Sequence, residues 1–380
     1  MALETWLIKV KKTISYSKAS KHNKSNYVGV LSFEIAGLMS KLLHLWNCLS
    51  DKNMIRLRHE SISPEGIRKI VSTDESFLLG LACAEMADNL RLVANSISRM
   101  SKKCKDPNLR CFDRWFDEFA NSGHDSHGWV LSSKDMEAKK TKMDRTTFTV
   151  LGRMKLVFGF EYPPRSLSAS AAVNPTANAN AFGFASAPSR DCSKQEANKK
   201  LTVRFFEWNS KLLGPPPSTL GGAGLALHYA NLIIVMEKMI KSLHFVGTDA
   251  RDDLYSMVPS SVRSSLRGRL KGVGFSASDP VLAGEWRAAL RNIMGWLSPL
   301  AHNMIKWQSE RSFEHQNLLP KTNVLRLQSL FFADKEKTEA AITELLVGLN
   351  YIWRFEKEMT AKALLGCSNF NGLLSSQSCR

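Results

Sequence analysis

The stretch with the clearest chemical potential is a glycine-rich turn that follows three prolines and precedes an apolar helix. Gly221, Gly222 and Gly224 lack a Cβ atom, so a phosphate or another backbone could approach them closely. A phosphate would sit at the N-terminus of the helix predicted over residues 225–240. The turn lacks the third glycine of a dinucleotide fingerprint and the Lys-Ser or Lys-Thr pair of a P-loop. We therefore predict close packing as its main role, with ligand binding as the alternative.

No other group of residues has the composition of a catalytic or metal-binding site. His124, Asp125 and His127 lie together in a loop flanked by glycines, but their spacing is short and no second ligand cluster occurs. Asp252 and Asp253 fall near a predicted helix start, where the helix dipole favours carboxylates without any catalytic role. The sequence contains no GxSxG, HExxH or Walker motif. We expect no catalytic residue, metal, cofactor or enzyme activity.

A basic stripe is the remaining candidate site. Arg263, Arg267 and Lys271 recur every four residues, so they share one face of a helix predicted over residues 259–271. The stripe could bind an anion on a phosphorylated partner or on nucleic acid, and a solvated face is the plainer interpretation. The net charge of +17 likewise favours acidic partners, which include nucleic acid, anionic membrane surfaces and acidic proteins.

The composition is that of a folded protein outside the secretory pathway. Apolar residues make up 44% of the chain, which argues against wholesale disorder. The seven cysteines, an odd number without a CxxC pair, favour a reducing compartment over a disulfide framework. Lysines at positions 9, 11 and 12 argue against a secretory signal peptide, and no window is apolar enough to span a bilayer.

A lysine-rich arm occupies residues 1–27. It could act as a nuclear-import signal or contact anionic lipid, and a solvated, flexible arm is the simplest interpretation. Ala2 stands where N-myristoylation requires glycine, so that lipid anchor is excluded. We expect an intracellular protein, with the nucleus favoured and the cytoplasm or the periphery of the plasma membrane as alternatives.

Apolar side chains at helical spacing predict the elements that position these residues. Ser72 and Glu75 have the spacing of a capping box. Thr248 or Asp249 is expected to cap a later helix. Pro299 is expected to kink or split the longest predicted helix. The predicted helices cover residues 28–49, 51–58, 64–71, 72–100, 107–119, 134–158, 225–240, 251–258, 259–271, 279–316, 323–332 and a segment that Asp334 caps. An aromatic stripe is expected to be core: Phe112, Trp115, Phe116 and Phe119.

The fold class predicted from these elements is all-α, with two helical bundles joined by a disordered linker. Residues 161–200 are rich in proline, serine, alanine and asparagine, which cannot bury enough apolar surface to offset the entropy of ordering. The predicted divisions are a basic arm (1–27), an N-terminal helical domain (28–160), the linker (161–200), a C-terminal helical domain (201–363) and a tail (364–380).

Two stretches carry a resemblance to a known family. Residues 218–231 read Ser-Thr-Leu-Gly-Gly-Ala-Gly-Leu-Ala-Leu-His-Tyr-Ala-Asn, and residues 249–255 read Asp-Ala-Arg-Asp-Asp-Leu-Tyr. Both resemble the plant phytosulfokine-simulator (PSI-type) family, which pairs two domains of unknown function and includes rapidly elicited, defence-related relatives. Residues 31–42 resemble the opening of the family's first domain. The segment around Asp144–Phe148 departs from the family, which has a longer helical segment there, so the N-terminal domain is shortened by comparison.

The resemblance implies a non-enzymatic intracellular signalling or scaffold protein that promotes growth. It implies a link to the peptide hormone phytosulfokine, with a further link to defence, through helical recognition of unidentified protein partners. The alternative is a basic helical protein that binds nucleic acid or an anionic membrane. The residues matched to the signature, expected to serve the fold or partner binding, are Gly221, Gly222, Gly224, His228, Tyr229, Asn231, Asp249, Arg251, Asp252, Asp253 and Tyr255.

Overall fold

The described part of the chain is helical throughout. The computed structural model describes residues 25–103, 110–121, 142–158, 204–242, 246–271, 277–310 and 324–375. Within these ranges there is no strand, only one isolated bridge between Thr219 and Asp334. The all-α class is therefore confirmed. Several expectations lie outside the described residues: those for the arm before Ser25, for the first residues of the helix predicted over 107–119, for the His124–His127 loop and for the linker over 161–200.

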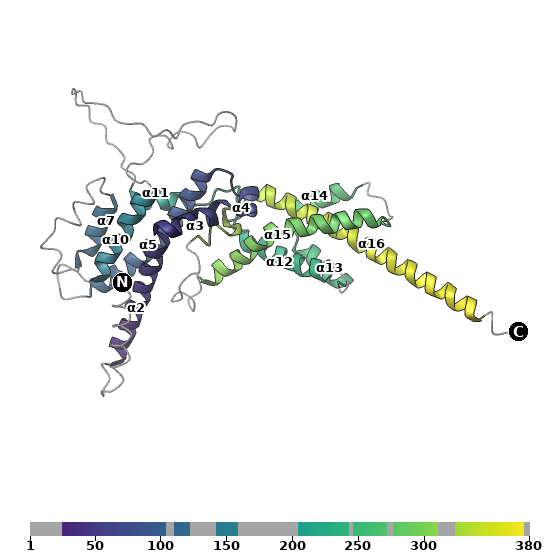
Figure 1. Cartoon of the computed structure of the whole chain (residues 1–380), viewed down its shortest axis with the longest axis horizontal. Coiled ribbons are helices and arrows are strands. Elements are labelled where there is room, and N and C mark those ends of the chain that lie inside the picture. Colours follow the sequence, from purple (N-terminus) through teal and green to yellow (C-terminus); the bar gives the residue numbers. More distant parts are fainter. Residues whose placement is uncertain are drawn as a thin grey trace, which may run out of the picture.

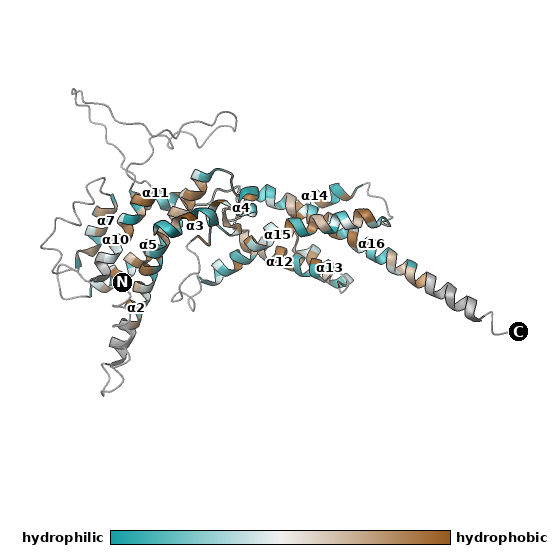
Figure 2. Cartoon of the chain, in the orientation of Figure 1, coloured by the Kyte–Doolittle hydropathy of each residue, from teal (hydrophilic) through white to brown (hydrophobic). Residues whose placement is uncertain are grey.

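The N-terminal half surrounds one long central helix (Figure 1). This helix, α5 (Glu75–Ser101), packs against five others, and its buried face carries the apolar stripe that predicted it. Figure 2 shows hydrophobic and hydrophilic residues interspersed along the helices of this half, as expected for helices with one buried face. One of these five helices is α11 (Phe205–Leu212), which follows the predicted linker in sequence yet packs on α5. The other helices of this half are α2 (Ser25–Cys48), α3 (Asp51–Ile62), α4 (Glu65–Ile70), α7 (Phe112–Asn121), α10 (Lys142–Phe158) and α11 (Phe205–Leu212).

The start of α5 differs from the predicted capping box. Asp74, rather than Ser72, is the N-cap, and its carboxylate accepts hydrogen bonds from the Ser76 and Phe77 N–H groups. The Ser72 hydroxyl instead accepts from the Asp74 N–H at 3.0 Å, which holds the cap in place. Aspartate is as good an N-cap as serine, so the sequence offered two possible N-cap residues, two positions apart.

Three of the four residues of the predicted aromatic stripe are core. Phe112, Phe116 and Phe119 are buried on α7, whereas Trp115 is half-buried against the core. Phe148 of α10 meets all three rings edge to face, with centroids 5.4–5.9 Å apart. Phe206 of α11 stacks on Phe116 at 5.4 Å. Helices that lie far apart in sequence are therefore joined by one aromatic cluster.

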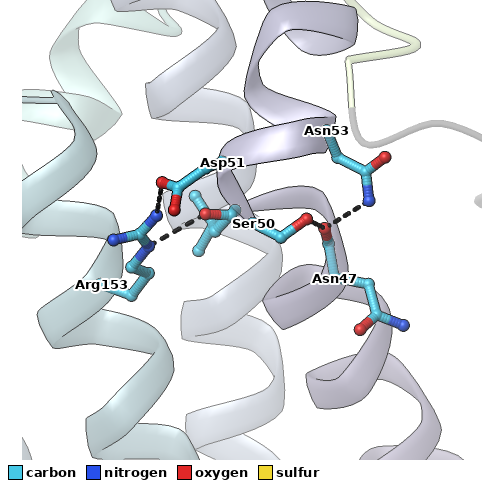
Figure 3. A network of polar contacts seen from close by, with 6 residues as sticks. Asn47, Ser50, Asp51, Asn53 and Arg153 are labelled. Atoms are coloured by element: carbon cyan, nitrogen blue, oxygen red, sulfur yellow. Dashed lines mark hydrogen bonds and ion pairs between the residues drawn. The ribbon is translucent and has the colours of Figure 1, made fainter.

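A polar network fixes α10 to the turn between α2 and α3 (Figure 3). The Arg153 Nε donates to the Leu49 carbonyl at 3.0 Å, and its guanidinium also pairs with the Asp51 carboxylate. In the same turn, the Ser50 hydroxyl and the Asn53 amide both donate to the Asn47 carbonyl, at 2.8 and 2.7 Å. The part of α10 that follows Asp144–Phe148, where the sequence departs from the family, is thus attached to the N-terminal half.

We expect Arg153→Met to lower the free energy of unfolding by about 1–3 kcal/mol, because the Leu49 carbonyl loses its charged donor. Urea denaturation followed by circular dichroism measures the change. Asp51 is 96% exposed, so Asp51→Asn should cost less than about 1 kcal/mol. Equal losses of stability in the two variants would show that the contact of Arg153 with the Leu49 carbonyl is not its main stabilising contact.

The C-terminal half is built around α15 (Pro280–Glu310), which packs between α12 (Ala226–Lys241) and α16 (Lys335–Ser375). The glycine-rich turn leads into α12, and α14 (Ser260–Leu270) lies along α16. Figure 1 shows the C-terminal part of α16 extending away from the other helices. The remaining elements of this half are α12 (Ala226–Lys241), α13 (Thr248–Met257), α14 (Ser260–Leu270), the 3-10 helix η2 (Leu330–Phe332) and α16 (Lys335–Ser375).

Four local expectations need correction in this half. Helix α15 continues through Pro299, so the proline does not split it. The longest helix in the described ranges is α16, with 41 residues, rather than α15, with 31 residues. Helix α13 has Gly247 at its N-cap without a side-chain hydrogen bond, so neither Thr248 nor Asp249 caps it. Residues 324–332 form turns and η2 rather than an α-helix. The cap at Asp334 is present, because its carboxylate accepts from the Lys337 N–H at 2.9 Å.

Among the described residues, no helix is both long and apolar enough to cross a membrane.

Candidate functional site

The glycine-rich turn is a point of close approach between backbones. A Cβ atom on Gly222 would lie 2.0 Å from the Pro216 carbonyl oxygen, and one on Gly221 would lie 2.3 Å from the Phe331 oxygen. Gly224 meets nothing within 4 Å, but its φ of +70° is one that other residues rarely adopt. Two of the three glycines are therefore needed for space, and the third is needed for its backbone conformation.

The backbone N–H groups of this turn already have protein acceptors. Leu220 donates to the Ala333 carbonyl at 2.8 Å, and Gly221 donates to the Phe331 carbonyl at 3.0 Å. Gly222 donates to the Thr219 hydroxyl at 3.1 Å. A phosphate cradle needs such groups pointing at the ligand. In this turn the Gly222 N–H closes the turn itself, and the Leu220 and Gly221 N–H groups hold the chain against residues 324–334, which we call the junction segment.

The junction segment also binds the N-terminal half. Its Asp334 N–H donates to the Ile70 carbonyl at the end of α4, at 2.6 Å. The Gln328 side-chain amide donates to the Glu60 carbonyl of α3 at 3.1 Å. The two halves consequently share one continuous buried core. The turn, the junction segment and the first helices of the chain form a single connected unit.

Glu85 is the centre of this contact. Its carboxylate, on α5, accepts the Arg326 N–H at 2.7 Å and the Leu327 N–H at 3.1 Å. Only 6% of Glu85 is exposed, and this burial raises the pKa of its carboxyl to about 7, although the two N–H groups and the Arg326 guanidinium oppose the shift. Asp88, one turn later, pairs with the same guanidinium at 3.2 Å.

Arg326 is held on its remaining sides by aromatic rings. Its guanidinium lies 5.2 Å from the Trp307 ring centroid and 5.6 Å from that of Phe331. Sequence reasoning missed both Arg326 and Glu85. A usable signal existed for Glu85, because it continues the buried stripe of Leu78 and Leu81 at helical spacing. A charge at such a position needs a partner, which the local sequence does not supply.

The signature residues of α12 tie that helix to its neighbours. Tyr229 is fully buried, and its hydroxyl donates to the Glu339 carboxylate of α16 at 2.6 Å. The Ser261 hydroxyl of α14 donates to the same oxygen at 2.9 Å. Burial, together with this carboxylate, raises the pKa of Tyr229. The ring of His228 contacts the Met257 carbonyl at 2.9 Å, and Asn231 is exposed.

Tyr229→Phe is expected to lower the free energy of unfolding by about 1.5–3 kcal/mol, the usual value for a hydrogen bond to a charged group. The ring would stay buried, so circular dichroism should show unchanged helix content. Urea denaturation provides the measurement. Ser261→Ala, which removes the other donor to Glu339 from an exposed position, is the matched control and should cost less. A Phe variant as stable as the unmodified protein would contradict this role of the hydroxyl.

The second signature stretch lies on α13 and is largely exposed. Asp249, Asp252 and Asp253 all face solvent. Arg251 is half-buried, with its guanidinium 5.4 Å from the ring centroid of Trp353 on α16. The arginine thus fastens α13 to the helical body while the carboxylates stay available on the surface.

The structure brings the basic stripe to this same place. Arg263 lies 5.7 Å from the ring centroid of Tyr255, and the Arg267 guanidinium donates to the Tyr255 hydroxyl at 3.2 Å. Lys271, one turn further, is exposed. We call the residues Asp249, Asp252, Asp253, Tyr255, Arg263, Arg267 and Lys271 the charged face.

The structure therefore separates the predicted site residues into two groups. The glycines and Tyr229 serve the junction and the packing of the C-terminal half, whereas the α13 residues and the basic stripe form the charged face. Within the described ranges, no group of three or more histidine, cysteine, aspartate or glutamate residues is placed to hold a metal ion.

Two family models match the chain, one in each half. A model described as a domain of unknown function (DUF3475) matches residues 30–86, from α2 into α5. A model described as a protein of unknown function (DUF668) matches residues 219–306, from the glycine-rich turn into α15. The junction segment lies outside both matches, although it binds residues of each.

Three curated proteins of Arabidopsis thaliana are similar to most of the chain. Protein PSK SIMULATOR 1 is 26% identical over 376 residues, which is 87% of this chain and 56% of that protein. Protein PSK SIMULATOR 3 is 23% identical over 372 residues, with the same two coverages. Protein PSK SIMULATOR 2 is 24% identical over 394 residues, covering 90% of this chain and 62% of its own length.

These matches confirm the resemblance carried by residues 218–231 and 249–255. The chain spans somewhat more than half the length of these curated relatives. No solved structure matches it.

Proposed function

We propose that this chain, which is similar to the plant phytosulfokine-simulator proteins, is a non-enzymatic signalling or scaffold protein that promotes growth. Its proposed link is to the peptide hormone phytosulfokine, with a further link to defence. It would act by binding other proteins.

The observation that carries this proposal is the contrast between the two groups of signature residues. The glycine-rich turn and Tyr229 are used within the fold, through close backbone contacts and a buried hydrogen bond. The carboxylates of the charged face are exposed and stand on a helix that Arg251 fixes to the body. Exposed side chains on a fixed helix can bind a partner without catalysing a reaction.

A non-enzymatic role is supported by how the candidate groups are used. The N–H groups of the glycine-rich turn have protein acceptors, so the turn offers no cradle to a nucleotide. Glu85 and Tyr229, whose pKa values burial raises, both hold helices together. Perturbed pKa values also occur in structural networks of this kind.

We further propose that the protein works inside the cell and chiefly in the nucleus. The net charge of +17 and the lysine-rich arm support this location. A fluorescent fusion of the full chain in plant cells tests it. Fluorescence excluded from nuclei, with an intact fusion on a gel, would contradict the location and leave the binding role standing.

The central experiment asks whether the chain restores growth through the charged face. The full chain is expressed in plants that lack the related proteins, and root elongation is measured with and without phytosulfokine. We expect the unmodified chain to restore the response to the hormone. The double variant Asp252→Lys/Asp253→Lys should not restore it, because reversing two exposed charges removes the complementarity to a partner.

The matched control is Asp117→Lys/Glu118→Lys, which reverses another exposed acidic pair, on α7 in the N-terminal half. It should restore growth as the unmodified chain does. Proximity labelling with the same three proteins identifies partners that only the α13 variant loses. Failure of the folded, unmodified chain to restore the response would overturn the proposed function.

The competing function as a binder of nucleic acid or anionic membrane makes a different prediction. Such binding would weaken steeply with added salt and would need the basic stripe. Two of its three cations, Arg263 and Arg267, are engaged with Tyr255. Salt-sensitive binding of the purified chain to RNA or anionic vesicles, lost in Arg263→Gln/Arg267→Gln/Lys271→Gln, would favour this alternative.

A further inference from the structure

Tyr255 differs from the other tyrosines whose side chains the structure describes. The hydroxyl groups of Tyr229 and Tyr351 donate hydrogen bonds, to the Glu339 carboxylate at 2.6 Å and the Asp279 carbonyl at 3.3 Å. The Tyr255 oxygen instead accepts one, from the Arg267 guanidinium at 3.2 Å. Only at Tyr255, among these three side chains, does the phenol oxygen face a cation.

A second arginine completes the surroundings of this ring. The Arg263 guanidinium lies 5.7 Å from the ring centroid of Tyr255, on the same face of α14 as Arg267. Lys271, which directly follows the last residue of α14, is exposed. Two arginines on one helix face, with a lysine just past its end, are the kind of groups that proteins use to bind phosphate.

Tyr255 is also accessible. It is 39% exposed and lies in the last turn of α13. The chain then becomes extended at Val258, with φ −69° and ψ 128°, before Pro259 leads into α14. Tyr255 therefore lies at an exposed helix end beside an extended segment, where a modifying enzyme can reach its hydroxyl.

We propose that Tyr255 is a phosphorylation site and that Arg263 and Arg267 receive its phosphate. In the transfer, the Tyr255 phenol oxygen bonds to the γ-phosphorus of ATP as the bond to the β–γ bridging oxygen breaks. ADP leaves, and the phenol proton passes to the base of a kinase that acts on tyrosine. The new phosphate brings a charge of about −1.5 to −2 to a place that now holds two arginines.

The consequence is a switch in how firmly α13 is held. One hydrogen bond from the Arg267 guanidinium to a neutral phenol oxygen would be replaced by hydrogen bonds from both arginines to an anionic phosphate, which are stronger and can be bidentate. Helix α13 would be fixed against α14, and with it the orientation of Asp252 and Asp253 on the charged face. This inference stands on the contacts of Tyr255 and does not require the proposed function.

The test installs phosphotyrosine at position 255 of the full chain by genetic-code expansion, so that no particular kinase is needed. We expect about tenfold slower amide hydrogen exchange over residues 247–258 and a higher Tm at low salt, both weakened by added salt. In the same protein with Arg263→Gln/Arg267→Gln, the phosphate should bring neither effect.

Phosphotyrosine at position 351 is the matched control, because that hydroxyl faces the Asp279 carbonyl oxygen. It should destabilise the protein or leave it unchanged. Unaltered or faster exchange over residues 247–258 in the phosphorylated protein would overturn the proposed phosphate receptor. So would an equal stabilisation after both arginines are replaced.

Use of the site is tested by mass spectrometry of the full chain recovered from plant cells treated with a phosphatase inhibitor. Phosphate on Tyr255 is the expected result, with Tyr255→Phe as the blank. Recovery of the unmodified Tyr255 peptide alone would overturn the assignment of a modification site. These readouts are modification and stability, so their failure is distinct from a failure to restore growth.

Discussion

Adding a single methyl group at Gly222 is expected to unfold the C-terminal half of this protein. In Gly222→Ala the new Cβ would lie 2.0 Å from the Pro216 carbonyl oxygen and 2.6 Å from its carbon. Both atoms belong to backbone held by neighbouring prolines, so neither can move aside as a flexible side chain would. We expect a loss of about 4 kcal/mol or more in the free energy of unfolding, seen in urea denaturation followed by circular dichroism.

Two other glycines serve as controls for this prediction. Gly224→Ala places a Cβ in open space but at a φ of +70°, and should cost about 1–2 kcal/mol. Gly268→Ala, inside α14 with nothing within 4 Å, should raise stability by about 0.5–1 kcal/mol. If Gly222→Ala proved no more damaging than Gly224→Ala, close backbone approach would not be the reason for this glycine.

Glu85→Ala should be the most damaging change of a single side chain in the N-terminal half. It removes the acceptor of two N–H groups in the junction segment and leaves Arg326 with Asp88 as its remaining carboxylate partner. Removing one partner from a buried charged contact of this kind costs about 3–5 kcal/mol. Because Glu85 joins the halves, we expect separate unfolding transitions in the variant and a single transition in the unmodified protein.

Asp88→Asn is the matched control, because it weakens the partly exposed ion pair with Arg326 and leaves Glu85 intact. It should cost less than about 1 kcal/mol and keep a single transition. Losses of equal size in Glu85→Ala and Asp88→Asn would mean that the two backbone contacts contribute little.

The pH dependence of stability gives an independent check on Glu85. Its folded pKa, about 7, is above the ordinary value of 4.5, so between these pH values the folded state holds more protons than the unfolded state. The contribution of Glu85 to stability is therefore full below about pH 4.5 and falls as pH rises through 7. Glu85→Gln should remove this component.

The unmodified protein must be compared with Glu85→Gln at each pH, because carboxylates whose pKa is lowered by folding make the protein more stable as pH rises. The hydrogen bond from Lys241 lowers the pKa of Glu237 to about 2, so its contribution is lost only in acid. We expect the Tm of the unmodified protein to fall relative to the Tm of Glu85→Gln as the pH is raised from 5 to 8. A constant difference would contradict the titration of Glu85 near pH 7.

The sequence was informative wherever structure depends on neighbours three or four residues away. The apolar stripes placed most helices, and Asp334 was identified as a cap before α16. Capping was predicted less well at α5 and α13, because several residues near each start could fill the role. Where polar residues are equivalent in chemistry, spacing alone cannot choose among them.

The junction could not be predicted in the same way. Gly221 and Phe331 are more than a hundred residues apart, and their contact is between backbone atoms, which leave no pattern of side chains. The chemistry of Glu85 likewise depends on N–H groups from residues 326 and 327. By contrast, the contact of Tyr255 with Arg267 joins consecutive helices. Predicting it would have required the geometry of the turn between them, which the sequence does not give.

The way the halves are joined has a consequence for how the chain tolerates breaks and insertions. On the far side of residues 159–203, α11 packs on α5, and the junction segment binds Glu85 and the Ile70 carbonyl. Two fragments, 1–160 and 201–380, should therefore assemble into the native structure when they are mixed. The covalent link through residues 159–203 would then not be needed to hold the two halves together.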